Sequence, residues 1–530
     1  MTTEDSQATG PEEIEAQRAP GPAPRQGLHR RLTLNSLANL SRYLFSILLS
    51  FFLTPFVVRT LGNSLYGFWV ILLSFVGYAG ILELGMQPAV VKIVGQYRGR
   101  GDHAGMVSPL GAAFVFFLAV GVFSALFFGL ALAPLLPHLV KQAPPELGSH
   151  RLLSIIALDV LIIFLNTFFT GVLYGWQLYP IKTLVDILCW SVNAVVLFMY
   201  LDRGGLLLLA ASKTVTDLVG LGATLFLIRK QVPGFRLDLR GVRLGSLGGL
   251  LGFGGRLFVS ASTTRVATYA HPLVVSSRIS SAATAFFAIP IRLADYAREI
   301  GWALATGFMP AFSELEARQE RSAMRSVYLR YSRYILIATL PMYVILFVYG
   351  RPFIGIWIGP EYGRRAALPL VFVTAAALVE NLQPLYWRLF IGIGRLDFSV
   401  LVSALTSLAS IVMGFLLVPL LDIGGPALGI LVAGVIAQGF FLVYASRYLE
   451  LSIPSLLGTI AFRPLVAGAL LFALTWSLKH FWGAQSLLAI AAGSLVGVAG
   501  YSILVWWITV DGDERQWLRG RLRRVILARS

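Results

Sequence analysis

The chain has 530 residues, of which 57% are hydrophobic and only 13% are charged. A soluble domain is about half apolar and about a quarter charged, so this composition excludes an ordinary soluble protein. The apolar residues form long unbroken runs and do not alternate as they would in barrel strands. We therefore expect an all-α polytopic membrane protein, because only helices and closed barrels satisfy the backbone in lipid.

The first 28 residues are polar, acidic and rich in proline and glycine. No apolar segment follows a basic start, so this stretch predicts a disordered tail and not a signal peptide. About fourteen membrane-spanning helices follow, each near the ~20 residues that a bilayer requires. The predicted spans are 36–58, 66–92, 108–135, 152–175, 181–200, 205–228, 246–270, 282–311, 333–350, 366–392, 398–419, 425–446, 459–478 and 486–508.

The orientation follows from the basic residues, which give the chain a net charge of +17. Of its 43 Lys and Arg, 27 lie in or beside the tails and loops on one side, and nine lie on the other side. The positive-inside rule therefore places both termini in the cytoplasm, and it accounts for the charge without nucleic acid. The inner membrane is the expected location. The segment 514–530 predicts either a basic amphipathic helix on the anionic cytoplasmic leaflet or a frayed basic tail.

A weak internal repeat divides the chain. Residues 65–85 align with 283–303, and residues 173–187 align with 392–406, at offsets of 218 and 219. Because this offset contains six spans, we expect two pseudo-symmetric six-helix lobes of parallel topology, with a site at the repeat interface. The expected divisions are a tail 1–28, a lobe 29–228, a basic linker 229–244, a second lobe 245–448, two additional helices 449–508 and a basic tail 509–530.

Motifs of catalysis are mostly missing from the sequence. There is no phosphate-binding GxxxxGK[ST] loop, no HExxH and no GxSxG, and the six histidines are scattered. The sequence Asp-Gly-Asp at 511–513 has the D-x-D form of some glycosyltransferases, but it follows the last predicted span with no folded domain after it. The single cysteine, Cys189, excludes an internal disulfide. We expect neither an enzyme nor a cofactor or metal site.

Ionisable residues inside the predicted spans are the main functional signal. Such residues are costly in lipid and usually face a protein interior or a water-filled cavity. The set contains seven cations and seven anions: Arg42, Lys213, Arg256, Arg265, Arg292, Arg298, Arg388, Glu83, Asp159, Asp186, Asp217, Asp295, Glu299 and Glu380. Lys213 and Asp217 are four residues apart and are expected to pair on one helix. Asp159 and Asp186 are interpreted as protonated, as ion-coupling groups or as partners of cations on other helices.

The seventh and eighth spans together carry four arginines and two acids. Arg256 and Arg265 are nine residues apart and face roughly opposite ways on a helix. On the eighth span, Arg292, Asp295 and Glu299 are expected on one face, with Arg298 beside it. Arginine favours phosphate because its planar fork donates two hydrogen bonds at once. These spans therefore predict an anion-binding region where the second lobe begins.

A motif in the first two spans resembles a known family. Residues 59–69 read RTLGNSLYGFW and residues 78–85 read YAGILELG. This is similar to the pattern R-x-L-G, Y-G-x-[FW] and L-D-L-G of the polysaccharide biosynthesis or O-antigen (Wzx-like) oligosaccharide flippases. That family belongs to the multidrug/oligosaccharidyl-lipid/polysaccharide (MOP) exporter superfamily. Glu83 stands where the family commonly has Asp.

The resemblance implies two six-helix bundles in a V around a central cationic cavity, working by alternating access. It implies a substrate, a polyprenyl-diphosphate-linked oligosaccharide moved from the cytoplasmic to the outer leaflet for cell-surface polysaccharide. It also implies as partners membrane lipids, a polysaccharide polymerase and glycosyltransferases. The spans that contact the cavity in related flippases carry, in this chain, Arg42, Arg256, Arg265, Arg292 and Arg298. Candidates for ion coupling or gating are Glu83, Asp159, Asp186, Lys213, Asp217 and Asp295.

The sequence leaves two other classes of protein open. A cation or drug antiporter of the same superfamily would use acids in an apolar cavity, with Glu83, Asp159 or Asp186 as the coupling site. A membrane scaffold or glycosyltransferase of polysaccharide assembly would need fewer intramembrane charges or a soluble catalytic domain. The arginines of the seventh and eighth spans favour the flippase.

Overall fold

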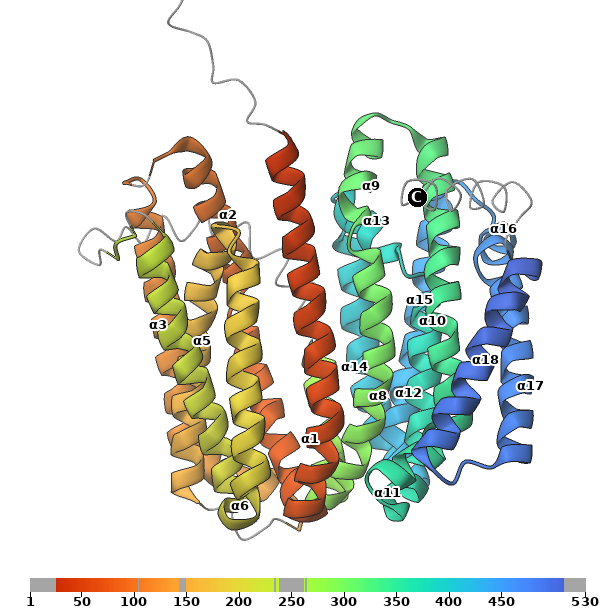
Figure 1. The fold of residues 1–530 in the computed structure, drawn as a ribbon, viewed down its shortest axis with the longest axis horizontal. Coiled ribbons are helices and arrows are strands. Elements are labelled where there is room, and N and C mark those ends of the chain that lie inside the picture. Colours follow the sequence, from red (N-terminus) through yellow and green to blue (C-terminus); the bar gives the residue numbers. More distant parts are fainter. Residues whose placement is uncertain are drawn as a thin grey trace, which may run out of the picture.

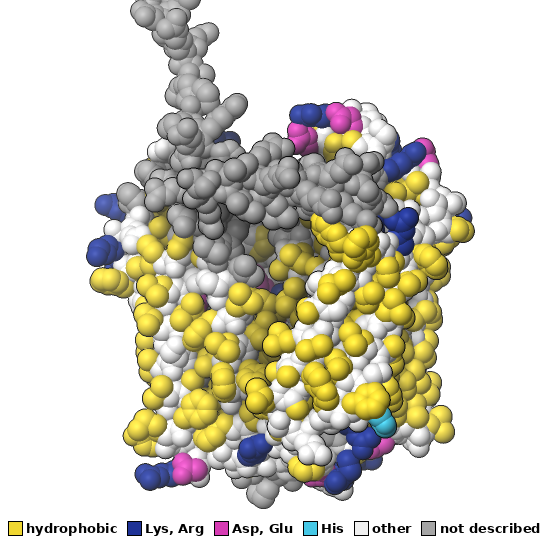
Figure 2. All heavy atoms as spheres, turned by 45° about the vertical axis from the view of Figure 1, so that its right-hand side comes forward, with side chains coloured by type: hydrophobic (Ala, Val, Ile, Leu, Met, Phe, Trp, Pro, Cys, Tyr) yellow, Lys and Arg dark blue, Asp and Glu magenta, His cyan; other side chains and the backbone are white. Residues whose placement is uncertain are grey.

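The computed structural model describes residues 25–102, 104–142, 149–232, 235–237, 262 and 265–509. Every regular element in these ranges is helical, which confirms the predicted all-α fold class. Nine helical segments of this part of the chain are long and apolar enough to cross a membrane. Figure 2 shows a broad apolar band between two rims where charged side chains gather, as expected for a protein surrounded by lipid.

The first group of helices forms one bundle (Figure 1). Its members are α1 (Arg25–Ile81), α2 (Met86–Arg100), α3 (Val107–Leu126), the π-helix η2 (Phe127–Ala131), α4 (Leu132–Leu139), α5 (His150–Gly175) and α6 (Tyr179–Gln231). Helices α1 and α5 pack on α6, and α2 and α3 pack on α5. The aromatic side chains of Phe68, Phe117 and Phe168 are fully buried in its core. Burial of each ring stabilises the bundle by removing apolar surface from water or lipid headgroups.

The second group forms another bundle beside it (Figure 1). A helix at 265–278 is followed by α8 (Ser281–Ala305), α9 (Phe308–Ala317), α10 (Arg321–Trp357), α11 (Pro360–Arg365), α12 (Ala367–Glu380), α13 (Tyr386–Gly392), α14 (Asp397–Leu421) and α15 (Gly424–Leu449). Helix α15 packs on α12 and α14, and α12 also packs on α8 and α10. Helix α8 carries four ionisable residues and is not among the nine apolar segments.

Two long helices flank the second bundle at its outer side (Figure 1). The short α16 (Ile453–Leu457) and the π-helix η4 (Gly458–Phe462) lead into α17 (Arg463–Trp482), and α18 (Leu487–Ile508) follows. Both α17 and α18 pack against α10. The contact is tight at Gly493, where an added Cβ would lie 2.4 Å from the hydroxyl of Tyr349. Glycine at this position therefore allows α18 to approach α10.

Several predicted spans differ from the helices in their boundaries. Helices α1 and α6 each contain two predicted spans, joined at Gly62 (φ 77°, ψ 170°) and Gly205 (φ 53°, ψ −146°). Only glycine adopts such backbone angles readily, so each chain reversal occurs at a glycine. The predicted span 66–92 is broken at Leu84 and Gly85, which both have positive φ. The count of fourteen spans stays a prediction, since most of the predicted seventh span lies outside the described residues.

The internal repeat has counterparts in the positions of the helices. Helix α6 begins at Tyr179 and α14 begins at Asp397, 218 residues later. The second half of α6 follows Gly205, and α15 begins at Gly424, 219 residues later. The boundaries proposed for the domains stay predictions. The tail 1–24, most of the linker 229–244 and the segment 510–530 lie outside the described residues.

The two bundles meet at the lower end of Figure 1, where α1 and α8 lie side by side before they diverge upward. Gly67 is at the centre of this contact, because an added Cβ would lie 1.7 Å from the carbonyl oxygen of Ser281. The hydroxyls of Ser64 and Ser281 are 3.0 Å apart. The backbone N–H of Lys141 donates to the carbonyl of Ser276 at 3.2 Å. We call these contacts the lower closure.

Arg59 fastens the same end to α10. Its Nε donates to the carbonyl of Ile358 at 3.0 Å and its Nη2 donates to that of Trp357 at 3.0 Å. The last carbonyls of a helix have no intrahelical partner and carry a partial negative charge, so a guanidinium is well suited to cap them. Trp357 Nε1 donates in return to the carbonyl of Phe51 at 2.8 Å, and the two rings stack at 5.5 Å. Arg59 and Gly67 of the family motif thus both belong to the lower closure.

We expect Arg59→Ala to shift the protein toward states in which the lower end is open. Hydrogen bonds that involve a charged group contribute about 1.5–3 kcal/mol each, so losing them shifts this equilibrium by roughly tenfold or more. Double electron–electron resonance (DEER) measures the distance between the two bundles. The spin labels are attached at the exposed positions 203 and 364, in a chain lacking Cys189. The control is Arg351→Ala, which removes an exposed arginine from the same end of α10. An unchanged distance distribution in Arg59→Ala would contradict this role.

Candidate substrate-binding site

Glu83 lies at the break between α1 and α2. Its Oε1 accepts a hydrogen bond of 3.1 Å from the backbone N–H of Gln87, in the first turn of α2. A carboxylate at this position satisfies one of the free N–H groups of a helix start and complements its dipole. Glu83 therefore acts as a cap in this structure, and its predicted part in ion coupling stays a prediction.

Arg42 is held inside the first bundle. Its Nη1 donates to the hydroxyl of Tyr174 at 2.9 Å, and its Nε lies 3.6 Å from Oδ2 of Asp186. Lys182, four residues before Asp186 on α6, also pairs with that carboxylate. Lys182 was not among the predicted site residues, although its spacing from Asp186 is the usual signal of a helical ion pair. The Asp186 carboxylate thus compensates the charge of Arg42 and also pairs with Lys182.

A second ion cluster joins α5 to the second half of α6. Lys213 Nζ lies 2.5 Å from Oδ2 of Asp159 and 2.7 Å from Oδ2 of Asp217. The local pair Lys213–Asp217 has the expected spacing, and Asp159 finds its cation across the helix interface. Asp159 is 4% exposed, and its other oxygen, Oδ1, has no hydrogen-bond partner. Two carboxylates and one ammonium give the cluster a formal charge of −1.

Lys213→Met is expected to lower the stability of the first bundle by about 3 kcal/mol, because it leaves two carboxylates in a low-dielectric interior without their cation. The thermal unfolding midpoint of the purified protein measures this effect. Lys230→Met, at the exposed end of the same helix, serves as the control. If both variants unfold at the wild-type temperature, the cluster does not hold α5 to α6.

Arg298 is the centre of an ion cluster in the second bundle. Its Nη1 lies 2.6 Å from Oδ1 of Asp295, and its Nε lies 2.9 Å from Oε2 of Glu380 on α12. The pairing with Asp295 has the spacing expected from the sequence, whereas Glu380 approaches from another helix. Arg298 is therefore compensated by two carboxylates. This cluster lines a cavity of about 210 Å³ inside the bundle.

Arg292 differs from Arg42 and Arg298 because no carboxylate among the described residues pairs with it. Its side chain is exposed, its Nε donates to the hydroxyl of Tyr296 at 3.3 Å, and its guanidinium lies 4.9 Å from the centre of that ring. At a rise of 1.5 Å per residue, Arg292 lies ~16 Å from the start of α8, near the middle of the helix. A cation at this depth requires a polar or anionic partner.

The charged residues of α8 face two directions. Glu299 accepts a hydrogen bond from the hydroxyl of Tyr43, which joins α8 to α1. Arg292 and Glu299 are seven residues apart and lie within ~20° of each other around the helix, so Arg292 faces the same side. Asp295 and Arg298 instead line the cavity of the second bundle. The expected single face of Arg292, Asp295 and Glu299 is therefore divided between the space beside α1 and the bundle interior.

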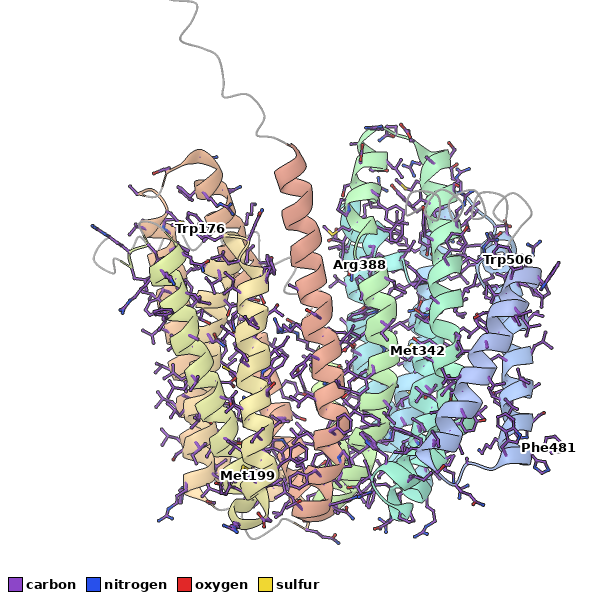
Figure 3. All side chains as sticks on the ribbon, in the orientation of Figure 1. Trp176, Met199, Met342, Arg388, Phe481 and Trp506 are labelled. Atoms are coloured by element: carbon purple, nitrogen blue, oxygen red, sulfur yellow. The ribbon has the colours of Figure 1, made fainter. Side chains whose placement is uncertain are left out.

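Two of the three remaining predicted arginines belong to the described residues. Arg265 is exposed at the start of the helix 265–278 and lies close enough to Glu83 to interact electrostatically. Arg388 donates to the hydroxyl of Thr306 at 3.4 Å, and Figure 3 shows it at the upper part of the second bundle. Arg256 lies outside the described residues. Arg265 lies on the helix 265–278 and Arg292 lies on α8. These are the two consecutive segments for which the sequence predicts an excess of positive charge.

The family of the chain follows from comparison with known proteins. The family model described as "Polysaccharide biosynthesis protein" matches residues 56–366, which include the whole family motif at residues 59–85. The chain belongs to this family. The match covers more than half of the sequence and confirms the resemblance carried by residues 59–85.

Two curated bacterial proteins are similar in sequence to this chain. An uncharacterised membrane protein of Bacillus subtilis (strain 168), EpsK, is 24% identical over 370 residues, which are 67% of this chain and 71% of EpsK. A putative O-antigen transporter of Shigella flexneri is 22% identical over 335 residues, or 62% of this chain and 77% of the transporter. The chain is accordingly a multi-pass membrane protein, as predicted, and it belongs to a family of transporters and not of enzymes.

The fold of the chain is similar to the folds of solved transporters, one of them described as a member of the MOP superfamily. An inward-facing multidrug resistance transporter of the MATE family superposes with a TM-score of 0.67 at 14% identity, covering 78% of this chain and 98% of the transporter. The lipid II flippase MurJ in an inward closed conformation gives 0.62 at 17% identity, covering 89% and 98%. The identities are low, so these likenesses concern the fold alone.

Proposed function

We propose that this protein moves a polyprenyl-diphosphate-linked oligosaccharide from the cytoplasmic to the outer leaflet of the inner membrane. The family match, the relative named as a putative O-antigen transporter and the likeness to a lipid II flippase support this substrate class. The observation that carries the proposal is Arg292, an exposed arginine in the middle of α8 that forms no ion pair with a described carboxylate. Its partner in this proposal is the diphosphate.

The chemistry of Arg292 suits a phosphate ligand. The ring and hydroxyl of Tyr296 position the guanidinium and engage only its Nε–H. A guanidinium has five N–H donors in a planar fork, so the remaining donors can form a bidentate contact with phosphate oxygens. Arg42 and Arg298 already bind carboxylates, and they contribute less to an anion site. Arg265 and the predicted Arg256 would extend the site along the neighbouring helix.

Alternating access gives the two bundles their proposed roles. The bundles move against each other as the lobes 29–228 and 245–448, and the helices of 449–508 move with the second lobe. From the positive-inside rule we infer that the upper end of Figure 1 faces the cytoplasm and that the lower closure seals the outer side. A diphosphate that moves outward across an interior-negative membrane gains about 2.3 kcal/mol per charge per 100 mV. A polysaccharide polymerase and glycosyltransferases are the proposed protein partners.

A cation antiporter of the same superfamily is the second candidate. The Asp159–Lys213–Asp217 cluster favours it, because it leaves a formal charge of −1 and an unpartnered carboxylate oxygen inside the first bundle. Such a carboxylate could bind a proton or a cation during transport. Arg292, which forms no ion pair among the described residues, argues for the anionic substrate instead.

Deletion of the gene tests the proposed function. We expect polyprenyl-diphosphate-linked oligosaccharides to accumulate in the cytoplasmic leaflet, with rescue by the wild-type chain. Leaflet-resolved measurement of these lipids, by their accessibility to an impermeant glycan-cleaving enzyme in oriented vesicles, gives the readout. A deletion strain with a normal lipid distribution and raised sensitivity to cationic drugs would contradict the flippase and support the antiporter.

A further inference from the structure

The second bundle contains a partly open cavity of about 210 Å³ that the proposed diphosphate contact does not use. The helix 265–278, α8, α12, α13, α14 and α15 surround it. Its lining combines two indoles, two carboxylates, one guanidinium, one imidazole, one amide and several hydroxyls with apolar side chains such as those of Ile291 and Val373. An acyl or polyprenyl tail is a poor occupant, because it would desolvate these charges without replacing their hydrogen bonds.

The two indoles come from different helices and lie on the upper side of the cavity. Trp302 belongs to α8 and is 44% exposed, and Trp387 belongs to α13. Both also line a small adjoining pocket with Arg298 and Glu380. An indole offers an apolar face and a single N–H donor. The C–H face of a sugar ring is the complementary surface, since it is apolar while the ring edge carries hydroxyls.

The charged groups of the cavity retain hydrogen-bonding capacity. Asp295 and Glu380 each engage one oxygen with Arg298, and their side chains are 23% and 30% exposed. An ionised carboxylate has two oxygens and about four acceptor sites, so each can accept further hydrogen bonds. Neighbouring sugar hydroxyls could donate to these carboxylates and accept from Arg298. A second phosphate is disfavoured here, because two carboxylates and one guanidinium leave a charge of −1.

The volume and position of the cavity indicate which part of the lipid-linked oligosaccharide it can bind. A volume of about 210 Å³ has room for a sugar ring, and the cavity is partly open to its surroundings. Asp295 is three residues from Arg292, a rise of ~4.5 Å along α8. A group bound at Asp295 is therefore next to a diphosphate bound at Arg292.

We propose that this cavity binds the sugar attached directly to the diphosphate, and that it binds a neutral monosaccharide unit. This inference rests on the proposed flippase function and adds a second contact to it. Helix α8 then presents the diphosphate site on the side that faces α1 and the sugar site on the side that faces the bundle interior. Specificity for the first sugar of the repeat unit resides in Trp302, Trp387 and the Asp295–Arg298–Glu380 cluster.

Binding of two lipids to the full chain in nanodiscs tests this assignment. The probes are the lipid-linked oligosaccharide extracted from the native membrane and polyprenyl diphosphate of the same chain length without sugar. Trp302→Leu and Trp387→Leu are expected to weaken binding of the oligosaccharide lipid by about tenfold and to leave binding of the sugar-free lipid unchanged. Trp302→Phe should retain most of the affinity, and Arg292→Ala should weaken both lipids.

The control is Trp482→Leu, which removes an exposed indole at the end of α17 far along the chain from the cavity. Equal losses for both lipids in the Trp302 and Trp387 variants, or no loss for either, would overturn the sugar site and leave the flippase standing. If the wild-type protein binds neither lipid, the result would contradict the proposed flippase function itself.

Discussion

Arg292→Ala lowers the rate of oligosaccharide-lipid translocation by about 10- to 100-fold in this account. The change removes a charge-assisted contact to the diphosphate, and hydrogen bonds to charged groups contribute about 1.5–3 kcal/mol each. Arg292→Lys keeps the charge but loses the bidentate geometry, so we expect an intermediate rate. Complementation of a deletion strain, with the amount of inserted protein measured in parallel, gives the comparison.

The matched control for Arg292 is Arg278→Ala. Arg278 is also an exposed arginine, on the helix that precedes α8, and its guanidinium lies 3.5 Å from the centre of the Phe415 ring. It lies at the lower end, away from the proposed diphosphate site, so its loss should leave the rate within about twofold of wild type. Equal translocation rates for Arg292→Ala and wild type would show that Arg292 does not bind the substrate.

Gly67→Ala is expected to prevent the lower closure and to abolish most transport. The added Cβ would lie 1.7 Å from the carbonyl oxygen of Ser281 and 3.2 Å from the backbone nitrogen of Ala285. Backbone atoms of α8 cannot move away without separating the two bundles, so the closed lower end becomes inaccessible. The variant should fold, because Gly67 contacts the other bundle and not the core of its own.

Two measurements check the Gly67 prediction. A single cysteine at position 64, in a chain lacking Cys189, should react faster with an impermeant maleimide in Gly67→Ala than in the parent. The control is Gly80→Ala on the same helix, where an added Cβ meets nothing within 4 Å. Transport by Gly67→Ala at the wild-type rate would show that the lower closure is not part of the cycle.

The sequence was most informative where local spacing decides the structure. The helical spacing of Lys213 and Asp217 and of Asp295 and Arg298 indicated contacts that the structure contains. Unbroken apolar runs indicated helices in lipid, and the nine apolar segments of the described ranges agree with that fold class. The family motif was also visible, but the physical role of its Arg59 and Gly67 required the partner helices.

Contacts between distant segments could not be derived from one sequence. The pairs Arg42–Asp186 and Arg298–Glu380 join residues on different helices, so their formation depends on which helices are neighbours. The hydrogen bond from Tyr43 to Glu299 spans the two bundles for the same reason. These pairs decide which arginines are compensated, and they single out Arg292 from a longer set of candidates.

The sugar cavity illustrates the same limit. Trp302 and Trp387 are unremarkable in the sequence, because aromatic residues are frequent in membrane helices. They become candidates for substrate contact only because α8 and α13 bring them to one cavity with Asp295 and Glu380. Identification of such a site needs the packing of six helices, which local patterns do not specify.

Translocation by the purified protein tests the central claim most directly. Proteoliposomes that contain the full chain and the extracted polyprenyl-diphosphate oligosaccharide can be treated with an impermeant glycan-cleaving enzyme, and the cleaved fraction followed over time. We expect cleavage to rise from about half to nearly all of the lipid with the wild-type protein, and to stay near half in protein-free vesicles. Cleavage that stops near half in the presence of correctly inserted wild-type protein would contradict the account.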